Sequence, residues 1–226
     1  MTRYSRNIKI IGAEGQKCLS ASSVLIIGCG ALGGQIAMLL AGAGIGRIGI
    51  VDYDNVSISN LQRQVFFKEG DIEHYKSETL ASRMLSLNSE IGVKAYVSKF
   101  NTETADLILN DGYDFVVDAT DSPQAKLNIE LECRKRGLPL SSAGVKGWTG
   151  QVITVVGDSL SLSQVYPDLL NVKNEDELGV MGPTPAVAAS IQASEVIKYL
   201  TGEGELLINR IMTFDLSTMS FNSISL

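Results

Sequence analysis

Cysteine and histidine are scarce in this chain of 226 residues, which limits the metal and redox chemistry that it can support. The three cysteines, Cys18, Cys29 and Cys133, are far apart and form no C-x-x-C pair. They argue against a disulfide framework and against a cysteine-based zinc site. The single histidine, His74, offers only one place to look for a Ser-His-Asp triad. We therefore expect a reduced, cytoplasmic protein without structural zinc.

The chain also lacks a basic run. Lys and Arg total 19 against 25 Asp and Glu, and the formal net charge is −6. This balance argues against a nucleic-acid partner. Hydrophobic residues make up 45% and charged residues 19%, which excludes a disordered chain.

One stretch is long and uncharged enough to resemble a membrane span. Residues 18–46 carry no charge. However, seven glycines fall between Gly28 and Gly46, and Gln35 interrupts the run. The stretch divides into a β-branched block and a block of small residues, so a buried strand, turn and helix explain it better. We expect no membrane association.

Strand and helix patterns alternate along the first two thirds of the chain. Strands are expected at 23–28, 47–52, 93–97, 113–118 and 138–143, and helices at 31–43, 76–87, 102–109 and 124–136. This alternation predicts an α/β, Rossmann-like, mostly parallel sheet with helices on both faces. A strand at 150–156, a helix at 184–200 and two closing strands at 206–216 and 219–226 extend it, as an antiparallel C-terminal extension. We expect a single domain over residues 1–226, with a long crossover loop at about 157–182.

A glycine motif follows the first predicted strand. Residues 28–33 read Gly-Cys-Gly-Ala-Leu-Gly, which is G-x-G-x-x-G placed between a strand and a helix. Gly28 permits the tight turn, Gly30 lets a phosphate approach the backbone, and Gly33 allows close packing of helix on sheet. Asp52 ends the second strand, where an acid can accept hydrogen bonds from a ribose. Nucleotide binding is the favoured interpretation, and a tight packing turn without a ligand is the alternative.

Polar residues beyond Asp52 favour ATP over NAD. Asn60, Arg63 and Lys76 follow the second strand, with cationic reach toward a polyphosphate. Another strand closes with Asp118-Ala-Thr-Asp121, and ligands bind at the carboxyl ends of such strands. An acid beside a triphosphate suggests a magnesium ligand. Lys126 could add a phosphate contact, although a surface helix position is the simpler expectation.

These motifs together resemble the ThiF/MoeB/HesA family, the bacterial relatives of ubiquitin-activating enzymes. The resemblance covers almost the whole chain and depends most on the R-Y-x-R string at the N-terminus and the S-N-L-Q-R-Q string at 59–64. Further matching positions are the glycine loop, Asp52-Tyr-Asp54, Lys76, Asp118 to Asp121, Gly144, Gly150-Gln151, residues 179–183, Gln192 and Glu195.

The resemblance implies an ATP-dependent adenylyltransferase. Such an enzyme adenylates the C-terminal glycine carboxylate of a ubiquitin-like sulfur-carrier protein ending in Gly-Gly, as in thiamine or molybdopterin metabolism, and releases pyrophosphate. The implied catalytic residues are Arg6, Arg63, Lys76 and Asp121, with Asp121 holding Mg²⁺ and Arg6 reaching across from the second subunit of a homodimer. The implied nucleotide-binding residues are Gly28, Gly30, Gly33, Asp52, Asp54, Asn60, Arg63, Gln64 and Lys76.

The chain departs from the family pattern in its cysteines. Family members often carry two C-x-x-C pairs that bind zinc, and some use a cysteine on the long loop for a covalent step with the carrier. Residues 161–167 and 217–222 contain no cysteine here, so zinc and a covalent transfer step are both in doubt. Two alternatives stay open: a tRNA-modifying, ATP-dependent dehydratase of the same superfamily, and a non-catalytic scaffold subunit.

Overall fold

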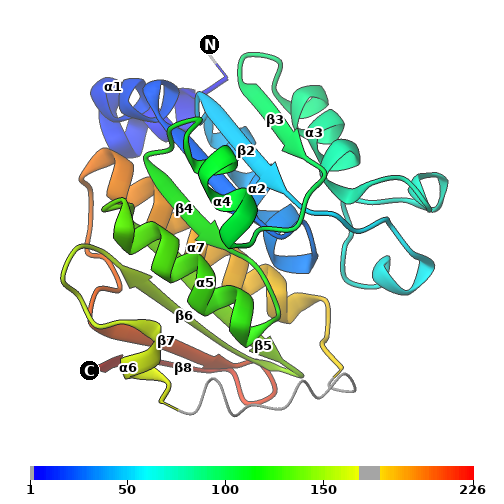
Figure 1. Cartoon of the computed structure of the whole chain (residues 1–226). Helices are drawn as coiled ribbons and strands as arrows, with labels where there is room; N and C mark the ends of the chain where they lie inside the picture. The colour runs from blue at the N-terminus through cyan, green and yellow to red at the C-terminus, as the bar shows by residue number, and fades with distance from the viewer. Residues whose placement is uncertain (1–2, 168–178) are drawn as a thin grey trace.

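The computed structural model describes residues 3–167 and 179–226, which build one eight-stranded sheet (Figure 1). The strand order is β3-β2-β1-β4-β5-β6-β7-β8. The first five strands in this order are parallel, and β6, β7 and β8 join as antiparallel neighbours. The strands are β1 (Ser23–Ile27), β2 (Arg47–Val51), β3 (Gly92–Tyr96), β4 (Phe115–Asp118), β5 (Leu140–Lys146), β6 (Thr149–Val155), β7 (Arg210–Asp215) and β8 (Ser220–Ser225).

Helices cover both faces of this sheet (Figure 1). One hydrophobic core joins the sheet to α1 (Ser5–Ala21), α2 (Ala31–Ala43), α3 (Lys76–Leu87) and α7 (Pro183–Thr201). The other core lies beneath α4 (Thr102–Leu109), α5 (Pro123–Lys135) and the short α6 (Leu162–Val165). The predicted α/β class with a parallel sheet and an antiparallel extension is confirmed.

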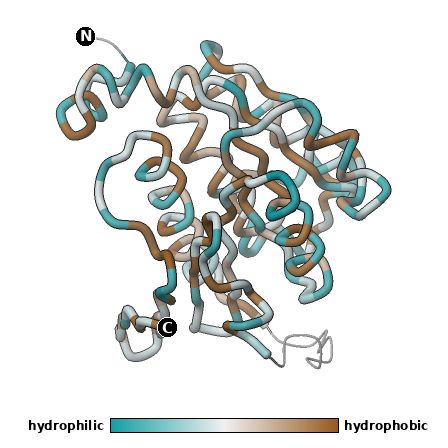
Figure 2. Tube along the Cα trace, turned by 60° about the vertical axis from the view of Figure 1, so that its left-hand side comes forward, coloured by the Kyte–Doolittle hydropathy of each residue, from teal (hydrophilic) through white to brown (hydrophobic). Residues whose placement is uncertain are grey.

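The central parallel strands are buried on both faces. All five residues of β1 are buried, as a strand with helices on either side requires. Figure 2 shows hydrophobic segments concentrated in the interior of the fold. Of the helices in residues 3–167 and 179–226, none combines the length and apolar character that crossing a membrane requires.

The N-terminal helix α1 was not anticipated from the sequence. It is broken at Gly12, which has a positive φ of 69°, so its two halves do not share one continuous hydrophobic face. Leu19 near its end is fully buried in the core, whereas Ile10 is 85% exposed. A kink of this kind removes the regular periodicity by which a helix is recognised.

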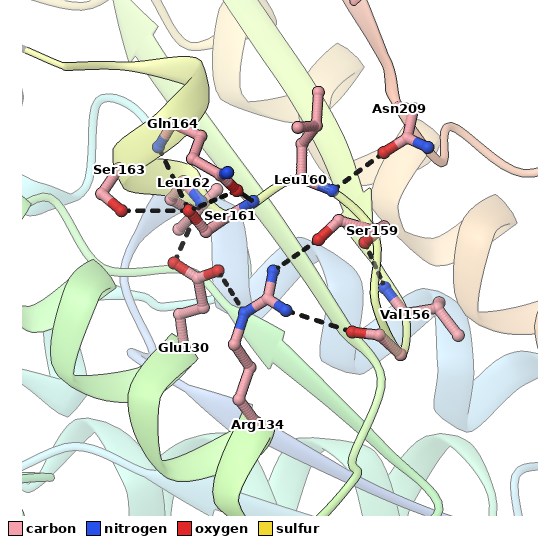
Figure 3. A network of polar contacts seen from close by, with 11 residues as sticks. Glu130, Arg134, Val156, Ser159, Leu160, Ser161, Leu162, Ser163, Gln164 and Asn209 are labelled. Carbon is pink, nitrogen blue, oxygen red and sulfur yellow. Dashed lines mark hydrogen bonds and ion pairs between the residues drawn. The ribbon is translucent and has the colours of Figure 1, made fainter.

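Part of the predicted long loop has defined structure, because α5 holds its beginning (Figure 3). The buried carboxylate of Glu130 accepts hydrogen bonds from the Leu162 N–H at 3.0 Å and from Arg134 Nε at 2.8 Å. The Arg134 guanidinium donates in turn to the carbonyl oxygens of Gly157 at 3.1 Å and Ser159 at 2.8 Å. Residues 168–178 of the predicted loop lie outside the described residues.

Candidate functional site

The glycine loop joins β1 to α2 with almost no free volume beneath it. Gly28 has a φ of 97°, and a Cβ on it would lie 2.7 Å from the Ala119 carbonyl oxygen. A Cβ on Gly33 would lie 1.8 Å from the Gly28 carbonyl oxygen. Both positions therefore exclude side chains, as predicted. Gly30 is different, because its Cβ would meet only the Gln64 Nε2 atom at 3.7 Å, which leaves the loop open to a ligand.

The first turn of α2 follows Gly30 directly. Within the described chain, no side chain caps this turn, and it contains no acidic residue. Its backbone N–H groups and the positive end of the helix dipole are therefore available to an anion. An uncapped helix start behind an open glycine fits the phosphate chain of a nucleotide.

Asp52 follows β2 and lies against the glycine loop. Its Oδ2 atom accepts a hydrogen bond from the Cys29 N–H at 2.7 Å, and its Oδ1 atom accepts one from the Asp54 N–H at 2.8 Å. Burial raises the pKa of Asp52, although these two N–H groups act against that shift. Burial also raises the pKa of the Cys29 thiol, with a further contribution from the Asp52 charge, so Cys29 is protonated at neutral pH. Sequence reasoning assigned Asp52 to a ribose and missed its role in shaping the loop.

Lys76 and Asp54 form an ion pair beside this carboxylate. Lys76 begins α3, its side chain is only 8% exposed, and its Nζ lies 2.9 Å from Asp54 Oδ2. The Lys76 N–H also donates to the Asp54 carbonyl oxygen at 2.9 Å. Asp54 is half exposed, so the pair lies at the edge of the site, where an incoming phosphate could compete for the ammonium group.

The segment with the S-N-L-Q-R-Q string folds over the N-terminus of α2. Asn60 closes a 3₁₀ turn by accepting from the Ser57 N–H at 3.2 Å, and Arg63 Nη1 donates to the Ser59 carbonyl oxygen at 3.0 Å. Gln64 is buried beside Gly30, and its Oε1 atom has no hydrogen-bond partner among the described residues. A buried acceptor without a donor costs free energy, which indicates that a ligand or water completes this site.

Asp121 lies on the turn between β4 and α5. This turn contacts the glycine loop, because Ala119 lies directly beneath Gly28 and Gly33, and the Asp121 side chain is exposed. Within residues 3–167 and 179–226, no cluster of three or more His, Cys, Asp or Glu could hold a metal ion. A single carboxylate fits Mg²⁺, which usually takes one or two protein ligands and completes its shell with phosphates and water. The expected lack of structural zinc stays a prediction.

Arg6 is not brought to the glycine loop of its own chain. The neighbouring Asn7 donates to the Ala43 carbonyl oxygen at 3.3 Å, so this part of α1 lies at the C-terminal end of α2. The glycine loop lies at the opposite, N-terminal end of α2. The 13 residues of α2 span about 20 Å along the helix axis. That separation exceeds the reach of an arginine side chain.

The expectation that Lys126 is a surface lysine is wrong. Its side chain is 11% exposed, and its Nζ lies 2.9 Å from Oδ2 of Asp118, which is fully buried. The sequence did not predict this ion pair, because the helical pattern around Lys126 does not show which strand its side chain will contact. An acid at the end of a wholly apolar strand was the available signal, since such a charge needs a partner.

A groove lies on the antiparallel part of the sheet. It has a volume of about 540 Å³ and is lined mainly by small or polar residues of β5 to β8. They are Gly144, Val145, Lys146, Thr149, Gly150, Gln151, Thr213, Phe214, Asp215, Ser220 and Asn222. Because Gly144 and Lys146 are at the carboxyl end of β5, the groove opens at the same edge of the sheet as the glycine loop.

Comparison with known proteins agrees with this geometry. The sequence matches the ThiF family over residues 4–226. It is 38% identical to the adenylyltransferase and sulfurtransferase MOCS3 of Dictyostelium discoideum over 98% of this chain and 54% of that protein. It is 33% identical to the SAMP-activating enzyme E1 of Haloferax volcanii over 99% of this chain and 84% of that protein. The chain spans about half the length of the MOCS3 relatives.

A solved structure has a similar fold. E. coli MccB with ATP superposes with a TM-score of 0.85 at 27% identity, over 100% of this chain and 71% of that chain. The family match, the relatives and the shared fold agree with the open glycine loop and the residues gathered around it. The chain therefore belongs to the ThiF family.

Proposed function

We propose that this chain is an ATP-dependent adenylyltransferase that activates the C-terminal carboxylate of a ubiquitin-like sulfur carrier ending in Gly-Gly. The observation that carries the proposal is the convergence of the open glycine loop, Asp52, the Lys76–Asp54 pair and the Asp121 turn at one edge of the sheet. The names of the MOCS3 and SAMP-activating relatives support the same activity.

The chemistry needs positioning and charge more than a general base. A C-terminal carboxylate is already ionised at neutral pH, so no residue has to remove a proton from it. Gly30 and the start of α2 receive the phosphates, and Asp52 orients the ribose. Lys76 and Arg63 neutralise charge as the carboxylate approaches, which lowers repulsion between two anions. Bound Mg²⁺, held by Asp121, would supply further neutralisation at the phosphates.

The groove on β5 to β8 is the proposed path of the carrier. Its lining of hydroxyl and amide side chains suits a polar, extended segment, and it opens at the same edge of the sheet as the glycine loop. Glycine residues on the carrier tail have no side chains, so they can pass close to the backbone of Gly144 and Gly150.

A homodimer would complete the site. Arg6 lies at the end of α2 remote from the glycine loop, so it can serve catalysis only in another chain. An arginine from a partner subunit would contribute a fixed positive charge to the triphosphate.

Carrier-dependent exchange of labelled pyrophosphate into ATP tests the proposed activity. We expect exchange only with a small carrier protein that ends in Gly-Gly, and at least a hundredfold loss in Asp121→Ala. Asp158→Ala is the matched control, because this exposed aspartate lies beyond β6 at the opposite edge of the sheet. A chain that binds ATP but shows no exchange with any carrier would favour the scaffold alternative. Exchange that requires tRNA would favour the dehydratase.

Mixing two inactive variants tests the dimer. Arg6→Ala and Asp121→Ala should each be inactive, but a freely exchanged mixture should recover about a quarter of the wild-type rate, because half of its dimers are mixed and hold one intact site. If the mixture stays inactive while native mass spectrometry shows mixed dimers, Arg6 does not act across the interface.

A further inference from the structure

A buried ion pair closes the turn that carries Asp121. Asp118 is the last residue of β4 and is fully buried, and Lys126 lies eight positions later on α5. Asp118 Oδ2 accepts hydrogen bonds from Lys126 Nζ at 2.9 Å and from Ser142 Oγ at 2.6 Å. Its Oδ1 accepts from the N–H and the hydroxyl of Thr120, at 3.0 and 2.6 Å. The carboxylate is therefore satisfied by four donors.

Lys126 also reaches the next strand. Its Nζ donates to the carbonyl oxygen of Ala143 in β5 at 2.7 Å. From the other face of the sheet, Gln192 of α7 donates to the backbone carbonyls of Asp118 and Ser141, each at 3.1 Å. The lysine thus joins the end of β4, the first turns of α5 and the middle of β5 at one point.

The turn closed in this way lies under the glycine loop. A Cβ on Gly28 would be 2.7 Å from the Ala119 carbonyl oxygen and 3.4 Å from the Thr120 nitrogen. A Cβ on Gly33 would be 3.2 Å from the Ala119 Cβ. A shift of this turn by a few tenths of an ångström would therefore move both the floor of the glycine loop and the Asp121 carboxylate.

We propose that Lys126 is a positioning residue, whose ion pair with Asp118 fixes the turn of residues 119–122 and thereby the placement of Asp121 toward Mg²⁺ and the phosphates. Lys126 acts through Asp118 and does not touch the nucleotide. A buried charge pair suits this task, because its two ends resist relative movement in a medium of low dielectric constant. The link to Mg²⁺ rests on the proposed adenylation site, whereas the fixing of the turn does not.

Hydrogen–deuterium exchange tests the fixing of the turn without any ligand. We expect Lys126→Met to increase exchange in peptides covering residues 118–123 and 28–34, and Lys126→Arg to restore protection. Lys126→Met leaves a buried carboxylate unpaired and can impair folding, so Asp118→Asn/Lys126→Met serves as a neutral version of the same pair. Lys135→Met is the matched control, because Lys135 pairs with Glu132 on the same helix and its side chain is 52% exposed.

Calorimetric titration of ATP at a series of MgCl₂ concentrations tests the second step. The folded neutral variant should need about tenfold more Mg²⁺ for half-maximal ATP affinity, the typical effect of losing a residue that orients a metal ligand. Lys135→Met should stay within about twofold of wild type, because Lys135 pairs with Glu132 on the same helix and is half exposed. Unchanged exchange at 118–123 in the folded neutral variant would overturn the proposal, as would an unchanged Mg²⁺ requirement. A wild-type protein that fails to bind ATP would overturn the proposed function and the Mg²⁺ link, while the exchange experiment would still decide whether Lys126 fixes the turn.

Discussion

The two halves of the sheet place their candidate sites in different ways. The parallel strand β1 is buried along its whole length, whereas every residue of the antiparallel edge strand β8 is exposed. Helices cover both faces of the central parallel strands β1 and β4, so only the turns beyond the ends of these strands remain accessible. In the antiparallel half, α7 covers one face of β6, and the other face of β5 to β8 forms an open groove.

This difference determines which atoms can recognise a ligand in each half. The nucleotide site uses backbone N–H groups and close glycine contacts, with a few charged side chains at its edge. The groove uses side chains that alternate along strands, so its specificity can change without altering the backbone. Substitutions in the parallel half should therefore affect folding and chemistry together, whereas substitutions in the groove should affect carrier binding alone.

The largest expected effect comes from adding one methyl group to the glycine loop. In Gly33→Ala the new Cβ would lie 1.8 Å from the Gly28 carbonyl oxygen, so the loop must move. We expect the free energy of unfolding to fall by about 1 to 3 kcal/mol and ATP binding to become unmeasurable. Gly70→Ala is the control, because a Cβ there meets no atom within 4 Å and should leave both quantities unchanged. Urea denaturation gives the free energy of unfolding, and calorimetry gives the ATP affinity. A Gly33→Ala protein that binds ATP normally would contradict this comparison.

The sequence predicted the parallel half well because its signals are local. Buried apolar strands, the spacing of Gly28, Gly30 and Gly33, and an acid after the second strand are all visible in short windows. The burial of Lys126 was missed because its partners Asp118 and Ala143 come from other elements. The groove was anticipated only in part. The family resemblance covers Gly144 and Gly150-Gln151, but the lining from β7 and β8 comes from strands that carry no motif.

A charge placed in the groove should separate carrier binding from nucleotide binding. Asn222 lines the groove from β8, whereas Ser225 lies on the opposite face of the same strand because side chains alternate. We expect Asn222→Arg to raise the KM for the carrier about tenfold with unchanged ATP affinity, and Ser225→Arg to leave both unchanged. Equal effects of the two substitutions on the carrier KM would show that the groove face has no special role.

The smallest effect should come from titrating Asp52, and it should have opposite signs in stability and in binding. Burial raises the pKa of Asp52, so the folded protein takes up a proton at a higher pH than the unfolded chain does. Within that window the folded state binds more protons, so the contribution of Asp52 to stability increases as the pH falls. ATP affinity should fall over the same range, because a protonated carboxyl is a weaker acceptor for a ribose hydroxyl.

Asp52→Asn has no carboxyl to titrate, so comparing it with wild type separates both effects from those of other titrating groups. Urea denaturation and ATP calorimetry of the two proteins from about pH 8 down to about pH 4, the ordinary range of an aspartate pKa, supply the comparison. If the stability difference between wild type and Asp52→Asn does not change with pH, burial does not raise this pKa. If only the affinity difference stays constant, Asp52 shapes the loop without contacting the nucleotide.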